Sequence, residues 1–140
     1  MKNLIIILFL FPQPLGNPVL NIIESTPKLA EEAPEKNFVT LTTYSPSATE
    51  TDSAPNITAS GFKIDSSNPA KHRIIAVSRD LKKRGFHFGK KVRIRKAGKF
   101  NGVYTVRDLM NKRHKKRIDI LVSSSQKPIK LSHVEVVLIN

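Results

Sequence analysis

Residues 89–122 read GKKVRIRKAGKFNGVYTVRDLMNKRHKKRIDILV, and this stretch holds three short runs rich in Val, Ile, Thr and Tyr. The runs cover residues 91–95, 102–107 and 117–122, and apolar side chains alternate with polar ones in them. Alternation with a period of two is typical of a β-strand that buries one face. Glycines at 89, 98 and 102 lie between the runs and favour turns. The stretch therefore predicts three successive β-strands.

Three more runs of the same kind lie outward from this stretch, at residues 38–44, 74–78 and 134–139. Six short strands separated by turn residues predict an all-β fold, a small six-stranded closed barrel. Asp80–Arg84 predicts a short helical turn, and Ser125–Lys130 is a second candidate for one.

The first 37 residues differ from the strand-rich part. Lys2 precedes an unbroken apolar run, Leu4–Phe11, which is far too short to cross a bilayer as a helix but fits the core of a signal peptide. Prolines and glutamates dominate the following residues, as in flexible linkers. We therefore expect a signal peptide over residues 1–16, a linker over 17–37 and one domain over 38–140. We further expect an exported protein, in the periplasm, at the outer membrane or in the cell wall, with no stable membrane span after processing.

Charge is divided unevenly along the chain. The whole sequence has 24 Lys and Arg against 11 Asp and Glu, a net charge of +13. Residues 71–140 hold 20 of the basic residues and only four acidic ones. Such a domain attracts polyanions, and charge alone does not choose among nucleic acid, anionic lipid and an anionic cell wall. The chain has no cysteine, which excludes disulfides, thiolate metal sites and cysteine nucleophiles.

Three of the four acidic residues in this basic half lie at or inside predicted strands: Asp80, Asp108 and Asp119. Each has an arginine next to it or two residues away, at positions 79, 107 and 117. For any one of them alone, a structural role as an ion-pair partner or turn former is the simpler interpretation. Three such aspartates together favour a functional site.

Five motifs follow one another along the chain: Val39–Pro46, Ile57–Gly61 (Ile-Thr-Ala-Ser-Gly), Ile75–Asp80, Phe88–Ile94, and Val106–Asp108 with Arg117–Ile120. In this order they resemble one known family, the three-aspartate or 3D domain, which includes the barrel of membrane-bound lytic transglycosylase A and stationary-phase survival or resuscitation-type proteins. The ten-residue gap between Asp108 and Asp119 is similar to the family spacing. The family follows its second aspartate with a D-x-G-G-x-I-K-G loop, and this chain has Met110 and Asn111 in place of the two glycines.

The resemblance implies a double-psi β-barrel and a lytic transglycosylase-like activity. Such enzymes cleave the β-1,4 bond between N-acetylmuramic acid and N-acetylglucosamine in peptidoglycan, and the C6 hydroxyl of the muramic acid attacks to form a 1,6-anhydro ring. Asp119 matches the catalytic acid, Asp108 its supporting carboxylate, and Asp80 the third aspartate. An acid that keeps its proton near neutral pH needs apolar surroundings or a nearby like charge. We expect Ile118 and Ile120 to supply the first and Asp108 the second.

Four other side chains are candidate substrate-binding groups. Thr58 and Ser60 are hydrogen-bond donors beside the aspartates, Tyr44 is a candidate for stacking on a sugar or for core packing, and Arg117 is a cation next to Asp119. An Arg117–Asp119 ion pair would favour a structural role for that aspartate. The four histidines have no metal-ligand spacing, so we expect no metal and no cofactor.

Two alternatives to the enzyme remain open. The first is a non-catalytic module whose basic face binds peptidoglycan or another anionic cell-wall polymer. The second is nucleic-acid binding through the basic segment 112–117, which we do not expect in an exported protein that lacks interleaved stacking aromatics. We expect a monomer that binds glycan strands or another anionic wall polymer and no nucleic acid.

Overall fold

A computed structural model describes residue 16, residues 33–46, residue 54 and residues 56–139. Residues 33–140 form one compact unit. Three short helical segments accompany six strands: η1 (Pro69–His72), α1 (Arg79–Lys83) and η2 (Gly98–Phe100). The strands are β1 (Lys36–Tyr44), β2 (Ile74–Val77), β3 (Lys91–Arg95), β4 (Gly102–Leu109), β5 (Arg117–Leu121) and β6 (Lys130–Ile139).

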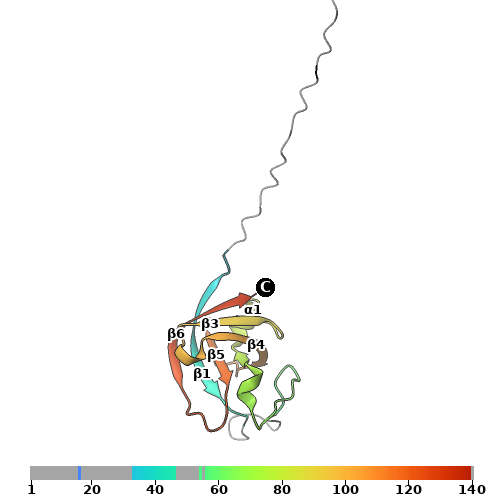
Figure 1. Cartoon of the computed structure of the whole chain (residues 1–140), viewed down its shortest axis with the longest axis vertical. Coiled ribbons are helices and arrows are strands. Elements are labelled where there is room, and N and C mark those ends of the chain that lie inside the picture. Colours follow the sequence, from blue (N-terminus) through green and yellow to red (C-terminus); the bar gives the residue numbers. More distant parts are fainter. Residues whose placement is uncertain (1–15, 17–32, 47–53, 55, 140) are drawn as a thin grey trace, which may run out of the picture. The chain divides into compact units, whose positions relative to one another are not determined.

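The six strands close into a barrel in the order β1-β5-β2-β4-β3-β6, and the last strand pairs with the first (Figure 1). Two of the pairs, β1 with β5 and β2 with β4, are parallel, and the other four are antiparallel. The prediction of an all-β closed barrel of six strands is confirmed. Its arrangement is compatible with a double-psi barrel.

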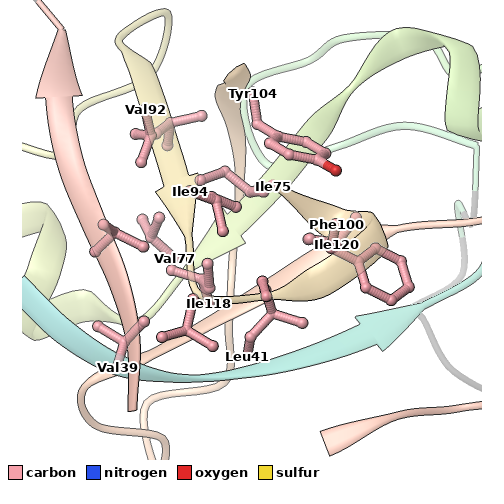
Figure 2. Packing of buried hydrophobic residues seen from close by; sticks show 14 of the residues in the cluster. Val39, Leu41, Ile75, Val77, Val92, Ile94, Phe100, Tyr104, Ile118 and Ile120 are labelled. Carbon is pink, nitrogen blue, oxygen red and sulfur yellow. The ribbon is translucent and has the colours of Figure 1, made fainter. Parts of the chain in front are cut away.

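The barrel interior is filled by alternate residues of every strand, as Figure 2 shows for the cluster around Leu41 and Ile118. Burying an Ile, Leu or Val side chain contributes roughly 1.5–3 kcal/mol, and this chain has no disulfide to add to packing. The strand residues of this core are Val39, Leu41, Ile75, Val77, Val92, Ile94, Tyr104, Val106, Ile118, Ile120, Val134 and Val136.

A second, smaller apolar cluster lies outside the barrel. Ile74 of β2 and Leu121 of β5 point away from the core, and Ile64 packs on them together with Tyr44 and Phe62. The segment that follows β1 in the chain therefore covers the outer face of β2 and β5. This covering matters because it brings residues 58–62 next to the aspartates.

The predicted element bounds hold within a few residues, with one exception. Residues 125–130 contain no helix, because the chain turns at Ser123–Gln126 and β6 begins at Lys130. Pro128, which lacks an N–H, lies between the turn and the strand. β1 begins at Lys36, two residues before the expected domain start.

The predicted signal peptide and most of the predicted linker lie outside the described residues. In the described part of the chain, no helix has the length and apolar character needed to cross a membrane.

Candidate functional site

The barrel places Asp108 and Asp119 on either side of one small residue. Asp119 of β5 is in register with Ala76 of β2, and Asp108 of β4 is in register with the same Ala76 from the other side. Adjacent strands are about 4.8 Å apart, so the two aspartate backbones are separated by on the order of 10 Å. Residues that are 11 positions apart in sequence thus lie at one level of the barrel wall.

A β-bulge places Asp108 on the outer face with Asp119. Ile75 pairs with Val106 and Ala76 pairs with Asp108, so Arg107 is the extra residue. Val106 fills the core, and simple alternation would turn Asp108 inward. The bulge turns the Asp108 side chain outward again. Its register partner Ala76 also faces outward, because Ile75 and Val77 on either side of it point into the core.

The Asp108 carboxylate is held by three hydrogen bonds. Its Oδ1 accepts the backbone N–H of Ala59 at 2.8 Å and that of Leu109 at 2.9 Å, and its Oδ2 accepts the Tyr44 hydroxyl at 3.1 Å. Acceptance from three donors is suited to the ionised carboxylate, which has acceptor sites only. Asp108 therefore fixes the loop after β1 and the Tyr44 side chain to the barrel.

Tyr44 reaches Asp108 from a distant strand and senses the charge of Asp119. It belongs to β1, which is three positions away from the β4 strand of Asp108 in the barrel, so its side chain crosses the outer face of β5 and β2 to reach Asp108. Burial raises the pKa of the Tyr44 phenol far above its ordinary value, and the charges of Asp108 and Asp119 raise it further. Tyr44 consequently stays protonated and donates its hydrogen bond at any ordinary pH.

Asp119 is partly buried on the outer face, and its Oδ1 is shielded from solvent. The expectation that Ile118 and Ile120 surround its carboxyl group is wrong, because both isoleucines point into the barrel core on the other face of β5. Its neighbours across the strands are Thr42 of β1 and Ala76 of β2, and Tyr44 lies within electrostatic reach.

Thr58 and Ser60 build the turn that holds Asp108. Their hydroxyls are 3.0 Å apart, and the Thr58 hydroxyl also accepts the Phe62 N–H at 3.1 Å. Gly61 closes the turn with a φ of 80°, in the left-handed region that favours glycine. This turn presents the Ala59 N–H to Asp108, so both hydroxyl groups are placed near the aspartate through the backbone between them.

Asp80 lies on the chain after β2 and binds a different element. Its Oδ2 accepts the backbone N–H of Lys116 at 2.9 Å, directly before β5 begins. Lys116 has a φ of 46°, a left-handed conformation that is strained for a non-glycine residue. Burial opposes ionisation of Asp80, but hydrogen bonds from Lys116 and Ser78 and from its own backbone, with the charge of Lys115, more than offset it and lower its pKa. Asp80 thus anchors the start of the Asp119 strand.

Asp80→Asn should lower the free energy of unfolding by about 1–2 kcal/mol at pH 7, because a charge-assisted hydrogen bond to a strained residue is weakened. The folded-state pKa is depressed, so this contribution is fully present above the unfolded-state pKa of about 4 and is lost as pH falls through the folded-state value. Urea unfolding at a series of pH values checks it. A wild-type advantage that persists at the lowest pH would contradict this role.

The segment after Asp108 turns without the glycine pair of the 3D family. Asn111 accepts the Arg113 N–H with its side-chain oxygen at 3.1 Å and the His114 N–H with its carbonyl at 3.0 Å. The Arg117 guanidinium lies 3.0 Å from His114 Nδ1 rather than in an ion pair with Asp119. Burial lowers the pKa of His114, as do the charges of Arg117 and Arg113, so its ring remains neutral and accepts from Arg117.

A small pocket adjoins Tyr44 where the parallel strands β1 and β5 end. Hydroxyl and amide groups dominate its lining, which suits the hydroxyl and acetamido groups of a sugar. Ser124 and Gln126 were not predicted as site residues, since a polar loop without a motif gives no signal of its fold position. The lining residues are Thr43, Tyr44, Ser45, Val122, Ser124, Gln126 and Pro128.

No protein-family model matches this chain, and no curated protein matches it either. Over the described residues, no group of three or more His, Asp or Glu side chains is arranged to hold a metal ion. The site consists of two outward aspartates at one level of the barrel, a tyrosine that donates a hydrogen bond to one of them, and an adjacent polar pocket.

Proposed function

We propose that this protein is a 3D-type peptidoglycan lytic transglycosylase that uses Asp119 as its acid and base. The observation that carries the proposal is the placement of Asp108 and Asp119 beside Ala76, with the Tyr44 hydroxyl hydrogen-bonded to Asp108. The order and spacing of the five motifs support it, as does the closed six-stranded barrel. The proposal includes export of the protein and a glycan strand of the cell wall as its substrate.

In the proposed reaction, Asp119 gives its proton to the glycosidic oxygen as the bond from C1 of N-acetylmuramic acid to that oxygen breaks. The C6 hydroxyl of the same sugar attacks C1, and its proton passes to Asp119, which regains its starting state. No water is consumed, so the second water-activating carboxylate of inverting hydrolases is not required. One general acid–base group of this kind contributes roughly 10²–10⁴-fold in rate.

Asp108 is proposed to act as a fixed negative charge. Its three hydrogen-bond donors hold the carboxylate in place. A negative charge close to a second carboxyl group makes ionisation of that group harder, and it also stabilises positive charge that develops at C1. Asp80 is proposed as a positioning residue, because its hydrogen bond to Lys116 fixes the start of the strand that carries Asp119.

Digestion of purified sacculi by the full chain tests this function. Mass spectrometry of the soluble products should show muropeptides with 1,6-anhydro ends. Products with reducing ends would mean hydrolysis, and absence of any soluble product would overturn the enzymatic proposal.

A non-catalytic wall-binding module is the second candidate, favoured by exposed cations such as Lys112 and Arg113 after β4. It predicts that the protein sediments with sacculi in a salt-sensitive manner and releases no product. In that case Asp119→Asn would leave sedimentation unchanged.

A further inference from the structure

The strand β3 carries a row of cations on its outer face. Val92 and Ile94 fill the core, while Lys91, Arg93 and Arg95 alternate with them and are exposed. Alternate residues of a strand are roughly 6.6 Å apart on one face, so the three charges form a straight, evenly spaced row. Among the described residues, no acidic side chain forms an ion pair with Lys91 or Arg93.

A buried carboxylate fixes one end of this row. Glu135 of β6 pairs in register with Arg95, and its side chain is only 6% exposed. Its oxygens lie 3.6 Å from Arg95 Nη1 and 4.0 Å from Lys96 Nζ, while both cations remain more than half exposed. The Glu135 carboxylate thus positions both the Arg95 and the Lys96 side chains, and these cations stay accessible to an external anion.

An exposed aromatic ring lies next to this end. Phe38 of β1 is in register with Glu135 and is 44% exposed, an unusual exposure for a large apolar side chain. The His133 ring lies against it with centroids 5.3 Å apart, and Lys96 Nζ is 5.2 Å from the Phe38 centroid. His133 and Lys96 both have a φ of 60°. Strained non-glycine residues of this kind often mark a binding site.

The row lies on the wall opposite Asp119. In the closed order β1-β5-β2-β4-β3-β6, β3 is three strands from β5 in either direction. A ligand bound along β3 therefore leaves the aspartate face open.

We propose that the outer face of β3, with Phe38 and His133 at its end, is a docking surface for an anionic polysaccharide. The cations pair with carboxylate or phosphate groups on successive units, and the Phe38 ring packs on the apolar face of one sugar. Single-stranded nucleic acid fits less well, because its binding surfaces stack successive bases on several aromatic rings. This face has one pair of rings, Phe38 and His133, tilted by 31° at one end. The surface is separate from the proposed catalytic site and does not depend on it.

The test measures affinity of the full chain by isothermal titration calorimetry with three probes: a defined oligogalacturonate, a neutral chitooligosaccharide of equal length and an oligothymidylate of equal charge. The wild type should prefer the oligogalacturonate and lose affinity as salt rises. The double variant Lys91→Gln/Arg93→Gln should lose about tenfold in affinity, roughly threefold for each contact with a charged group after screening by solvent. Phe38→Ala should lose about threefold or more, as expected when one ring contact with a sugar is removed.

The matched control is Arg79→Gln/Lys83→Gln, which removes one exposed arginine and one exposed lysine from α1. Its affinity for the oligogalacturonate should fall by less than about twofold, because only the long-range electrostatic field of the protein changes. Equal losses in the two double variants would show that net charge alone attracts the polymer and would overturn the proposal. Tighter binding of the oligothymidylate, or unchanged affinity in Phe38→Ala, would overturn the sugar assignment. Asp119→Asn should bind as the wild type does even if the lytic activity is absent.

Discussion

Asp119→Asn is expected to slow the release of 1,6-anhydro muropeptides from sacculi by at least about a hundredfold, because the amide cannot give or take the proton. The carboxylate and amide have nearly the same size, and the side chain lies on the outer face of β5 rather than in the core. Folding should therefore survive. The rate is measured from the appearance of soluble anhydro products over time.

The control for this variant is Asp65→Asn, which removes one negative charge from an exposed aspartate that pairs with Lys71 and is not part of the proposed site. It should release products at the wild-type rate. Release by Asp119→Asn at that same rate would contradict the acid–base role and leave Asp119 a structural residue.

Asp108→Ala is expected to lower the free energy of unfolding by about 3 kcal/mol. The change removes three hydrogen bonds to a carboxylate and leaves the Tyr44 hydroxyl and the Ala59 and Leu109 N–H groups without this acceptor. The segment around residues 58–62 should loosen first, since the Ala59 bond ties it to the barrel. Urea denaturation gives the stability, and amide hydrogen exchange gives the local loosening.

Tyr44→Phe is the matched comparison for Asp108→Ala, because it removes one of the three bonds and keeps the ring. It should cost about 1 kcal/mol. Equal stability losses in the two variants would show that the backbone donors contribute little. Asp108→Asn keeps an oxygen for the two N–H groups, so it should fold well and still release products more slowly than the wild type, since the fixed charge is gone.

The strands that could be predicted accurately are those whose pattern is strict. β3 has its predicted bounds because Val92 and Ile94 alternate with cations without interruption. β6 begins at Lys130, four residues before the predicted start at residue 134. The polar Ser132 and His133 break the apolar pattern there, so the sequence gives no sign of a strand. β4 extends to Leu109 because a bulge at Arg107, which no sequence pattern marks, lets the pairing continue.

The candidate site, like the strands, could be predicted only in part. The spacing of Asp108 and Asp119 indicated a pair, and the structure brings them to one level beside Ala76. Asp80 does not join this pair and instead accepts a hydrogen bond from the Lys116 N–H. The N–H donors that hold Asp108 could not be predicted, because every residue but proline has a backbone N–H and none of them is marked in the sequence. The Ala59 N–H meets Asp108 only because the turn closed by Gly61 places it there.

Binding of a muropeptide glycan to the aspartate face tests the central claim most directly. A short GlcNAc–MurNAc oligosaccharide is titrated into isotope-labelled Asp119→Asn protein, which binds without turnover, and backbone amide shifts are followed by NMR. The account predicts that the largest shifts fall at Thr42–Ser45, Ala59, Asp108, position 119 and Ser124–Gln126. Shifts confined to β3 and β6, or no shifts at any glycan concentration, would contradict it.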